Sequence, residues 1–426
     1  MSEYRVKNIS KLPMLFGQKQ GGLARTLILT VLGKLQVGSL TMVEQDETLL
    51  FGSKTDPEGP HAEVHVHDLD LYRRILTGGT IAAGETYIEG LWSSPNLTEV
   101  TRAFSGNMAM LEAMSDQQNW LLRLALKTTH WGRRNTAARS RENIAAHYDL
   151  GNEFFSLFLD PSMMYSAAVF PTPQSDLAAA SQHKLQLICE DLELKPEDHL
   201  VEIGTGWGGM AIYAAEHYQC RVTTTTISKE QFDYAVEAVK KRGLQDRITV
   251  LFDDYRDLEG QFDKLVSIEM IEAVGHQFYD TYFGTLSRLL KPEGKAVIQS
   301  ITMTDQRYEQ ARDAVDFIKR YIFPGGCLPS LNVISNAVAN VTDMQLSGLR
   351  DITRDYADTL QDWHDTFLTQ LDQVRAMGFD DRFIRMWRYY LSYCEGGFRE
   401  RIIGTYQITM TKPYFDPTDQ TICCCP

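Results

Sequence analysis

The stretch Val201-Glu202-Ile203-Gly204-Thr205-Gly206-Trp207-Gly208-Gly209 decides the fold, because an apolar strand runs into a glycine-rich loop and a helical pattern follows. Glycines let a backbone turn tightly and approach a ligand closely. The next predicted strand ends in Thr224-Thr225-Thr226, and not in the acid that would hold the ribose diol of a dinucleotide. Glu202 stands where it would meet the amino group of S-adenosylmethionine (SAM). We therefore expect a SAM site here, with a purely structural glycine turn as the alternative.

The alternation of strand and helix around this loop extends from about residue 185 to residue 300. Ligands of such folds bind at the carboxyl ends of the strands, and strands that alternate with helices form a mostly parallel sheet covered on both faces. The pattern therefore predicts an α/β domain. Its predicted strands are 199–203, 220–225, 248–252, 264–268 and 295–299, and its predicted helices include 210–217 and 229–242.

The first part of the chain follows a different pattern. Residues 35–70 alternate polar and apolar side chains between turn residues, which predicts a small β-rich unit. Residues 96–126 carry apolar side chains at helical spacing. This part of the chain therefore predicts a second, smaller α+β domain.

The charge is unevenly distributed along the 426 residues. The net charge is −14, yet residues 1–150 hold 16 basic and 16 acidic side chains, so residues 151–426 carry the whole excess. Residues 117–141 contain six basic side chains and no acidic one. Such a stretch is attracted to anionic phosphates, with a solvated helix or linker as the alternative. The composition, 43% apolar and 23% charged, excludes collagen-like, disordered and disulfide-scaffold classes.

The lack of a secretory signal and the distribution of the cysteines predict a cytoplasmic protein. The N-terminus lacks the apolar run of a secretory signal, and the best apolar run, residues 23–37, is interrupted and falls short of a bilayer span. Four of the seven cysteines are scattered through the chain, as expected of free thiols in a reducing compartment. The tail Cys423-Cys424-Cys425 lacks the aliphatic pattern of a prenylation box, and we expect a frayed terminus there.

Several segments in order give the catalytic part a family resemblance. Over roughly residues 142–412 the chain resembles the cyclopropane-fatty-acyl-phospholipid synthases and the mycolic acid cyclopropane synthases. The resemblance implies a Rossmann-like SAM-dependent methyltransferase domain with a seven-stranded, mostly parallel sheet, and residues 35–105 resemble the smaller N-terminal domain of the family. The segments that carry it are 147–152, Tyr165-Ser166, the glycine loop, 226–231, 254–257, 271–275, 321–329, 355–360 and 394–398.

The resemblance implies a set of SAM contacts. Residues around the loop would line the site, Thr226 and Gln231 would take over the ribose contacts, and three consecutive residues would flank the adenine. The first group is Tyr165, Ser166, Glu202, Gly204, Gly206 and Gly208, and the last is Asp254, Tyr255 and Arg256.

The family's reaction also needs a base. A cis double bond attacks the sulfonium methyl group, and the resulting carbocation loses a proton as a cyclopropane ring closes. A bicarbonate ion takes this proton in the family. The residues that match its binding site are Glu272, Tyr356 and Ile301, which contributes its backbone, while Cys394 matches a thiol often marked as active.

Two positions depart from the family pattern. Gln299 replaces the usual histidine of the anion site, and Ala167 stands where many members carry cysteine. A glutamine can donate an amide hydrogen bond to an anion but cannot shuttle a proton. An enzyme that stops at methylation, giving methyl-branched or methylene fatty acyl chains, is therefore a second hypothesis. Glu269 receives no role, and no metal is expected.

The substrate of the family sets the remaining expectations. A double bond deep in a leaflet requires contact with the membrane, and the stretch 120–141 interleaves tryptophan and leucine with basic side chains, as interfacial segments do. We expect a cytoplasmic protein at the inner face of the membrane that docks on anionic phospholipid bilayer and does not bind nucleic acid; the resemblance alone implies a homodimer. An N-methyltransferase of soluble amines and a non-catalytic lipid carrier are the other readings.

These expectations divide the chain into four regions. We expect an N-terminal lipid-interaction domain, a basic linker or helix, a SAM-dependent catalytic domain and a cysteine-rich tail. Their expected bounds are 1–116, 117–145, 146–415 and 416–426.

Overall fold

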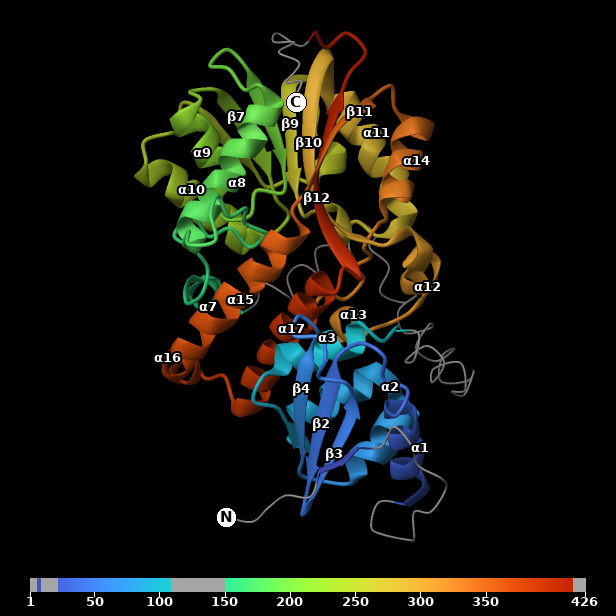
Figure 1. The fold of residues 1–426 in the computed structure, drawn as a ribbon. Coiled ribbons are helices and arrows are strands. Elements are labelled where there is room, and N and C mark those ends of the chain that lie inside the picture. The colour runs from blue at the N-terminus through green and yellow to red at the C-terminus, as the bar shows by residue number, and fades with distance from the viewer. Residues whose placement is uncertain (1–5, 9–21, 109–149, 417–426) are drawn as a thin grey trace. The chain divides into compact units, whose positions relative to one another are not determined.

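The computed structural model describes residues 6–8, 22–108 and 150–416. The chain forms two compact units, each assembled from separate stretches of sequence (Figure 1). Among the described residues, unit 1 holds those up to 108 together with 313–324 and 356–403, and unit 2 holds 150–312, 325–355 and 404–416. Residues 313–324 and 356–403 thus cluster with the N-terminal part of the chain, although they fall within the range expected for the catalytic domain.

Unit 2 contains a seven-stranded sheet in the order β11-β12-β10-β9-β6-β7-β8. The pairs β6/β7, β7/β8, β6/β9 and β9/β10 are parallel, whereas β11 and β12 are antiparallel. This arrangement confirms the predicted fold class. The strands are β6 His199–Ile203, β7 Arg221–Thr225, β8 Ile248–Leu251, β9 Phe262–Ile268, β10 Leu290–Met303, β11 Gln345–Asp351 and β12 Ile403–Thr411.

Helices cover both faces of this sheet (Figure 1), because its central strands point apolar side chains toward both faces. Leu200 and Val222 pack with α8, α9 and α10, whereas Val201 and Ile203 pack with α11 and α14. The remaining helices of the unit are short. The bounds are α7 Asn152–Ser156, α8 Leu177–Leu192, α9 Gly209–His217, α10 Lys229–Lys241, α11 Tyr279–Leu289, α12 Tyr308–Asp313 and α14 Leu331–Val341.

Unit 1 contains a five-stranded sheet in the order β1-β3-β2-β4-β5, as the alternation over residues 35–70 predicts for its central strands. The strands are β1 Val6–Asn8, β2 Ser39–Glu44, β3 Glu47–Gly52, β4 His61–Val66 and β5 Trp92–Ser93. The helices are α1 Gly22–Leu32, α2 Asp70–Ile88, α3 Leu97–Ser105, α13 Phe317–Tyr321, α15 Thr353–Thr369, α16 Leu371–Ala376 and α17 Asp381–Arg399.

Helix α3 is shorter than the helix predicted over 96–126. It begins at Leu97, one residue after its cap Asn96, but ends at Ser105. The next residues form a turn in which the Asn107 amide donates to the carbonyls of Val37 and Ala103 and accepts from two backbone N–H groups. These bonds tie the chain to the β-rich part and break the helix. The rest of the predicted helix lies outside the described residues.

The C-terminal helix α17 belongs to unit 1 through polar contacts with α3. Thr98 donates to Glu395 at 2.8 Å, Thr101 donates to the Ser392 carbonyl at 2.6 Å, and Arg102 pairs with Glu400 at 2.8 Å. Residues almost 300 positions apart therefore close the same core. In the described ranges no helix is long and apolar enough to cross a bilayer.

We predict that Gly84→Ala destabilises unit 1. A Cβ atom at Gly84 would lie 2.6 Å from the Phe317 ring and 2.9 Å from the Tyr389 ring, both of which are buried. Overpacking of this kind costs about 1–3 kcal/mol, and urea unfolding would measure it. Gly284→Ala on α11 is the matched control, since its Cβ would meet nothing within 4 Å and alanine favours a helix. Equal stability of the two variants would contradict the packing argument.

Candidate active site

The glycine loop lies at the carboxyl end of β6, where it connects that strand to α9. Gly204, Gly206 and Gly208 all adopt positive φ angles, of 99°, 52° and 90°, which glycine reaches without strain. The N–H groups of Gly204 and Thr205 both donate to the Thr225 carbonyl, which ties the loop to the end of β7. A Cβ at Gly206 would meet nothing within 4 Å, so the space over this residue is open. The loop thus leaves room for a ligand at the start of α9.

Glu202 is the carboxylate closest to this loop in sequence, and it is buried. Burial raises its pKa to about 8, against the opposing effects of Thr224 and Lys184. Its buried Oε2 has no hydrogen-bond partner among the described residues. An unpaired buried carboxylate oxygen is costly, and the ammonium of SAM would satisfy it. This atom is the observation that fits SAM to the loop.

The residues expected at the ribose are brought together at the end of β7. The Thr226 hydroxyl donates to Gln231 Oε1 at 2.9 Å, and Ser228 caps α10 by accepting from the Gln231 N–H group. No described residue accepts from the Gln231 amide nitrogen, so that donor is left for a ligand. The loop itself does not exclude a dinucleotide, because Gly204, Gly206 and Gly209 match its spacing. The distinction depends on the absence of an acid at this strand end.

The three residues expected at the adenine form one short structure after β8. Asp254 is buried and accepts two hydrogen bonds from the Arg256 guanidinium, at 2.8 and 2.6 Å. The Tyr255 ring packs edge-on against Tyr282 with centroids 5.8 Å apart. Its buried hydroxyl has no partner in the described part of the chain. Tyr255 is therefore partly a core residue, and Asp254 is held by Arg256.

Tyr165 and Ser166 lie on a loop that packs beside the glycine loop. The Tyr165 ring contacts Phe155 with centroids 5.1 Å apart, and Phe155 contacts Trp207 of the loop at 5.2 Å. The Trp207 indole donates to Asn152 at 2.7 Å. An aromatic chain thus connects the two expected parts of the SAM site. The Ser166 hydroxyl accepts from the buried Lys184 ammonium at 2.8 Å.

Glu272 is half-buried at the carboxyl end of the sheet. Its Oε1 accepts from the Ile301 N–H at 2.5 Å and from the Ser300 hydroxyl at 3.1 Å, while its Oε2 is buried without a partner among the described residues. Burial, and next the negative charge of Glu269, raise its pKa to about 8. Both effects favour the protonated form of Glu272. A neutral carboxyl in an apolar site can donate a hydrogen bond to an anion.

Gln299 does not point its amide protons at Glu272. Its Nε2 donates to Glu269 Oε1 at 2.8 Å and to the Ala167 carbonyl at 3.2 Å, and its Oε1 accepts from Gln407. Both amide protons are thus engaged. Glu269 also accepts from the Ala167 N–H at 2.9 Å and has a left-handed φ of 49°. Gln299 therefore holds Glu269 and Ala167 in place, and its direct contact with an anion stays a prediction.

Tyr356 and Cys394 belong to unit 1. The Tyr356 ring stacks on Phe398 with centroids 4.5 Å apart. Burial raises the pKa of the Cys394 thiol far above its usual range, so a reactive thiolate is disfavoured. The catalytic roles that the resemblance implies for these two residues stay predictions.

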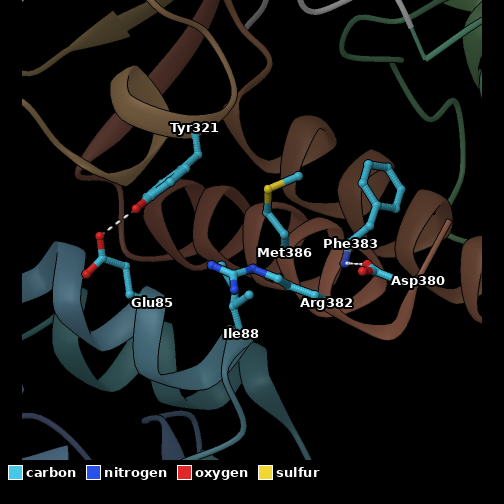
Figure 2. A pocket seen from close by; sticks show the side chains of 7 residues that line it. All are labelled: Glu85, Ile88, Tyr321, Asp380, Arg382, Phe383 and Met386. Carbon is cyan, nitrogen blue, oxygen red and sulfur yellow. Dashed lines mark hydrogen bonds between the residues drawn. The ribbon is translucent and has the colours of Figure 1, made fainter.

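Unit 1 also contains a pocket of about 280 Å³. In Figure 2 the Tyr321 hydroxyl points toward the Glu85 carboxylate, to which it donates a hydrogen bond. Arg382 of α17 extends toward Ile88 of α2. None of the predicted site residues lines it. Its lining residues are Glu85, Ile88, Tyr321, Asp380, Arg382, Phe383 and Met386.

Two residues of the site were missed by the sequence reasoning. Lys184 stands on the buried face of α8, four residues after Ala180 and four before Ile188, so a lysine within an apolar stripe was the available signal. Glu269 directly follows the buried strand β9, at the sheet edge where ligands bind. Both charges are readable in the sequence, but only the fold brings them together.

The fold and the site define a class of protein before any relative is considered. A seven-stranded, mostly parallel sheet, a glycine loop after β6 and an unpaired buried acid before that loop are the features of a SAM-dependent methyltransferase. Comparison with known proteins supports this assignment. The family model described as mycolic acid cyclopropane synthetase matches residues 135–408, and the chain belongs to this family.

Two relatives are equally similar in sequence. Tuberculostearic acid methyltransferase UfaA1 of Mycobacterium tuberculosis is 37% identical over 364 residues, covering 84% of each chain. Cyclopropane-fatty-acyl-phospholipid synthase of Escherichia coli is 37% identical over 361 residues, covering 82% of this chain and 88% of the relative.

Solved structures agree on the fold. The mycolic acid cyclopropane synthase CmaA1, in complex with S-adenosylhomocysteine (SAH) and CTAB, is 29% identical with a TM-score of 0.60, covering 64% of this chain and 98% of that one. Coclaurine N-methyltransferase, at 17% identity and a TM-score of 0.60, covers 78% of this chain and 99% of that one and shares the fold.

We predict that ligand binding releases a proton from Glu202. Because burial raises the pKa of this carboxyl to about 8, it is largely protonated at pH 7. An ammonium beside it favours the ionised form, so affinity rises between pH 6 and pH 8. Calorimetry with SAH in buffers of different ionisation enthalpy measures the released proton. Glu202→Gln should abolish the release and exposed Glu259→Gln should not; an unchanged release in Glu202→Gln would contradict the assignment.

Proposed function

We propose that this protein transfers a methylene group from SAM to the cis double bond of unsaturated phospholipid acyl chains and forms a cyclopropane fatty acid. The observation that carries the proposal is the buried Oε2 of Glu272, which has no hydrogen-bond partner among the described residues and lies at the same sheet edge as the glycine loop. The name of the Escherichia coli relative supports the substrate and the product.

The reaction places clear demands on the site. The π electrons of the double bond form a new bond to the methyl carbon while the bond from that carbon to sulfur breaks and SAH leaves, so that a carbocation remains on the acyl chain. Loss of a proton from that methyl group lets its C–H electrons close the ring. The site must exclude water, which would quench the cation, and must hold a base near the transferred carbon.

Glu272 suits an anion rather than the cation itself. A carboxyl that is protonated and oriented by Ile301 and Ser300 can donate a hydrogen bond to a small anion, and it carries no negative charge that would trap the carbocation. A bicarbonate ion bound there would supply the proton acceptor. Ile301 contributes by its N–H group, which fixes Glu272. Gln299 contributes less directly, since its amide protons hold Glu269 and Ala167.

Methylation without ring closure is the second candidate function. The specific observation in its favour is that Gln299 cannot shuttle a proton and is fully hydrogen-bonded. The Mycobacterium tuberculosis relative is named a methyltransferase and is as similar as the synthase of Escherichia coli. The likeness to the N-methyltransferase shows the fold alone, and an enzyme of soluble amines would need neither the expected N-terminal lipid-interaction domain nor the basic stretch.

The products separate these two functions. We expect that incubation with SAM and vesicles of mono-unsaturated phospholipid yields fatty acid methyl esters that gain one CH₂ and resist hydrogenation. Gas chromatography with mass spectrometry measures both properties. A product that takes up hydrogen, or a methyl branch that requires a reductant to appear, would overturn ring closure and support methylation.

Glu272→Gln tests the anion site in the same assay. We expect turnover to fall at least 100-fold, the scale of a lost acid–base group, while SAH still binds in calorimetry. Exposed Glu259→Gln is the control for a lost carboxylate elsewhere in unit 2. Retained turnover in Glu272→Gln would refute the assignment.

We also propose that the protein is cytoplasmic and docks on the inner face of the membrane through the stretch 120–141, which lies outside the described residues. Each basic side chain near an anionic surface contributes about 1 kcal/mol. Changing Arg123, Lys127, Arg133 and Arg134 to Glu should therefore abolish flotation with phosphatidylglycerol vesicles at low salt. The same change at Lys229, Lys240, Lys241 and Arg242, which are exposed around α10, is the charge-matched control. If both variants floated with the vesicles to the same extent, docking through the stretch 120–141 would be contradicted.

A further inference from the structure

Lys184 is a fully buried cation beside the glycine loop that the proposed chemistry does not use. It stands on α8 with no exposed surface. Its ammonium donates one hydrogen bond, to the Ser166 hydroxyl at 2.8 Å, and makes no ion pair with any described residue. Burying an ammonium without a direct counter-ion is costly. The cost of burying the Lys184 ammonium therefore indicates that its charge has a function.

The charges around Lys184 explain how it stays in place. Burial lowers the pKa of the Lys184 ammonium to about 8. The acidic side chains of Glu269, Asp160 and Glu202 oppose this effect. Asp160 is already engaged by the N–H groups of Ser162 and Met164. None of the three approaches within ion-pair distance. The ammonium therefore adds positive potential to the site, because no ion pair with a single partner neutralises it.

The hydrogen bond from Lys184 fixes the direction of the Ser166 hydroxyl. Because the Ser166 oxygen accepts from the ammonium, the hydroxyl proton must point elsewhere, and no described residue accepts it. A hydroxyl that accepts from a cation is also a stronger donor, since linked hydrogen bonds polarise each other. The Lys184–Ser166 pair therefore presents a strengthened donor that suits an anionic acceptor.

We propose that Lys184 is a positioning residue that, through Ser166, recognises the carboxylate of the amino-acid end of SAM. The proposal rests on the SAM site described above. SAM carries one carboxylate and one ammonium on the same carbon atom. Glu202 offers an unpaired carboxylate oxygen for the ammonium, and the Lys184–Ser166 pair offers a donor of opposite character for the carboxylate. Glu202 and Lys184 interact electrostatically, so both recognition elements belong to one buried cluster.

The test measures binding rather than turnover. Lys184→Met removes the charged end of the side chain and keeps an unbranched apolar stem of nearly the same volume, and changes that conserve volume are tolerated best in a core. The probes are SAH and its decarboxylated form, S-adenosyl-3-thiopropylamine, which keeps the amine and lacks the carboxylate. We expect calorimetry to show a loss of roughly tenfold or more for SAH, as for a lost charge-assisted hydrogen bond, and no change for the decarboxylated probe.

Two further variants separate positioning from a structural role. Lys295→Met is the matched control, because Lys295 is also a buried lysine of unit 2 but is paired with Glu193 at 2.8 Å; it should bind both probes normally. The double variant Lys184→Met/Ser166→Ala should lose no more SAH affinity than the weaker-binding single variant, since coupled residues are not additive.

Each outcome decides the proposal. A selective loss for SAH with non-additive coupling supports it. Unchanged SAH binding by Lys184→Met, an equal loss for both probes or additive losses would overturn it, the second because Lys184 would then only support Glu202 or the fold. Failure of the unaltered protein to bind SAH would overturn the SAM site itself, and this proposal with it.

Discussion

The structure of the site depends on charged groups that are held out of water at one edge of a parallel sheet. Glu202 precedes the glycine loop, Glu272 follows β9, and Lys184 reaches the same edge from α8. In this environment each charge matters more than it would at the surface, and burial raises the pKa of both carboxyls and lowers that of the ammonium, in each case to about 8. The cluster is arranged for a zwitterionic ligand, whose two charges match those that the protein leaves unpaired.

The sequence predicted the parts of this site that depend on local pattern. The run from Val201 to Gly209 predicted a strand, a loop and a helix, and all three form as expected. Thr226 and Gln231, which the resemblance puts at the ribose, lie together and form a hydrogen bond, while their contact with ribose stays a prediction. These features depend on residues that are near one another in the chain, or on a motif whose spacing is preserved.

The sequence did not predict features that depend on contacts between distant segments. Gln299 was expected to face an anion, yet Ala167, Glu269 and Gln407 occupy its amide. Lys184 was overlooked because a lysine in a helix is ordinarily solvated, and only the packing of α8 shows otherwise. The helix over 96–126 was predicted to be continuous, but a turn at Asn107 interrupts it, and this turn depends on the backbone near Val37. In each case the deciding partner lies far away in sequence.

The composition of unit 1 has a consequence for the order of events during synthesis. Its sheet and helix α3 are complete by Ser105, but the helix that packs on α3 ends at Arg399. Ribosomes add about 5–20 residues per second, so the side of α3 that faces α17 waits on the order of 15–60 seconds for its partner. During that interval Thr98 and Thr101 lack the α17 groups to which they donate hydrogen bonds in the finished protein. Unit 1 therefore becomes a finished fold only after the central strands of unit 2 have emerged.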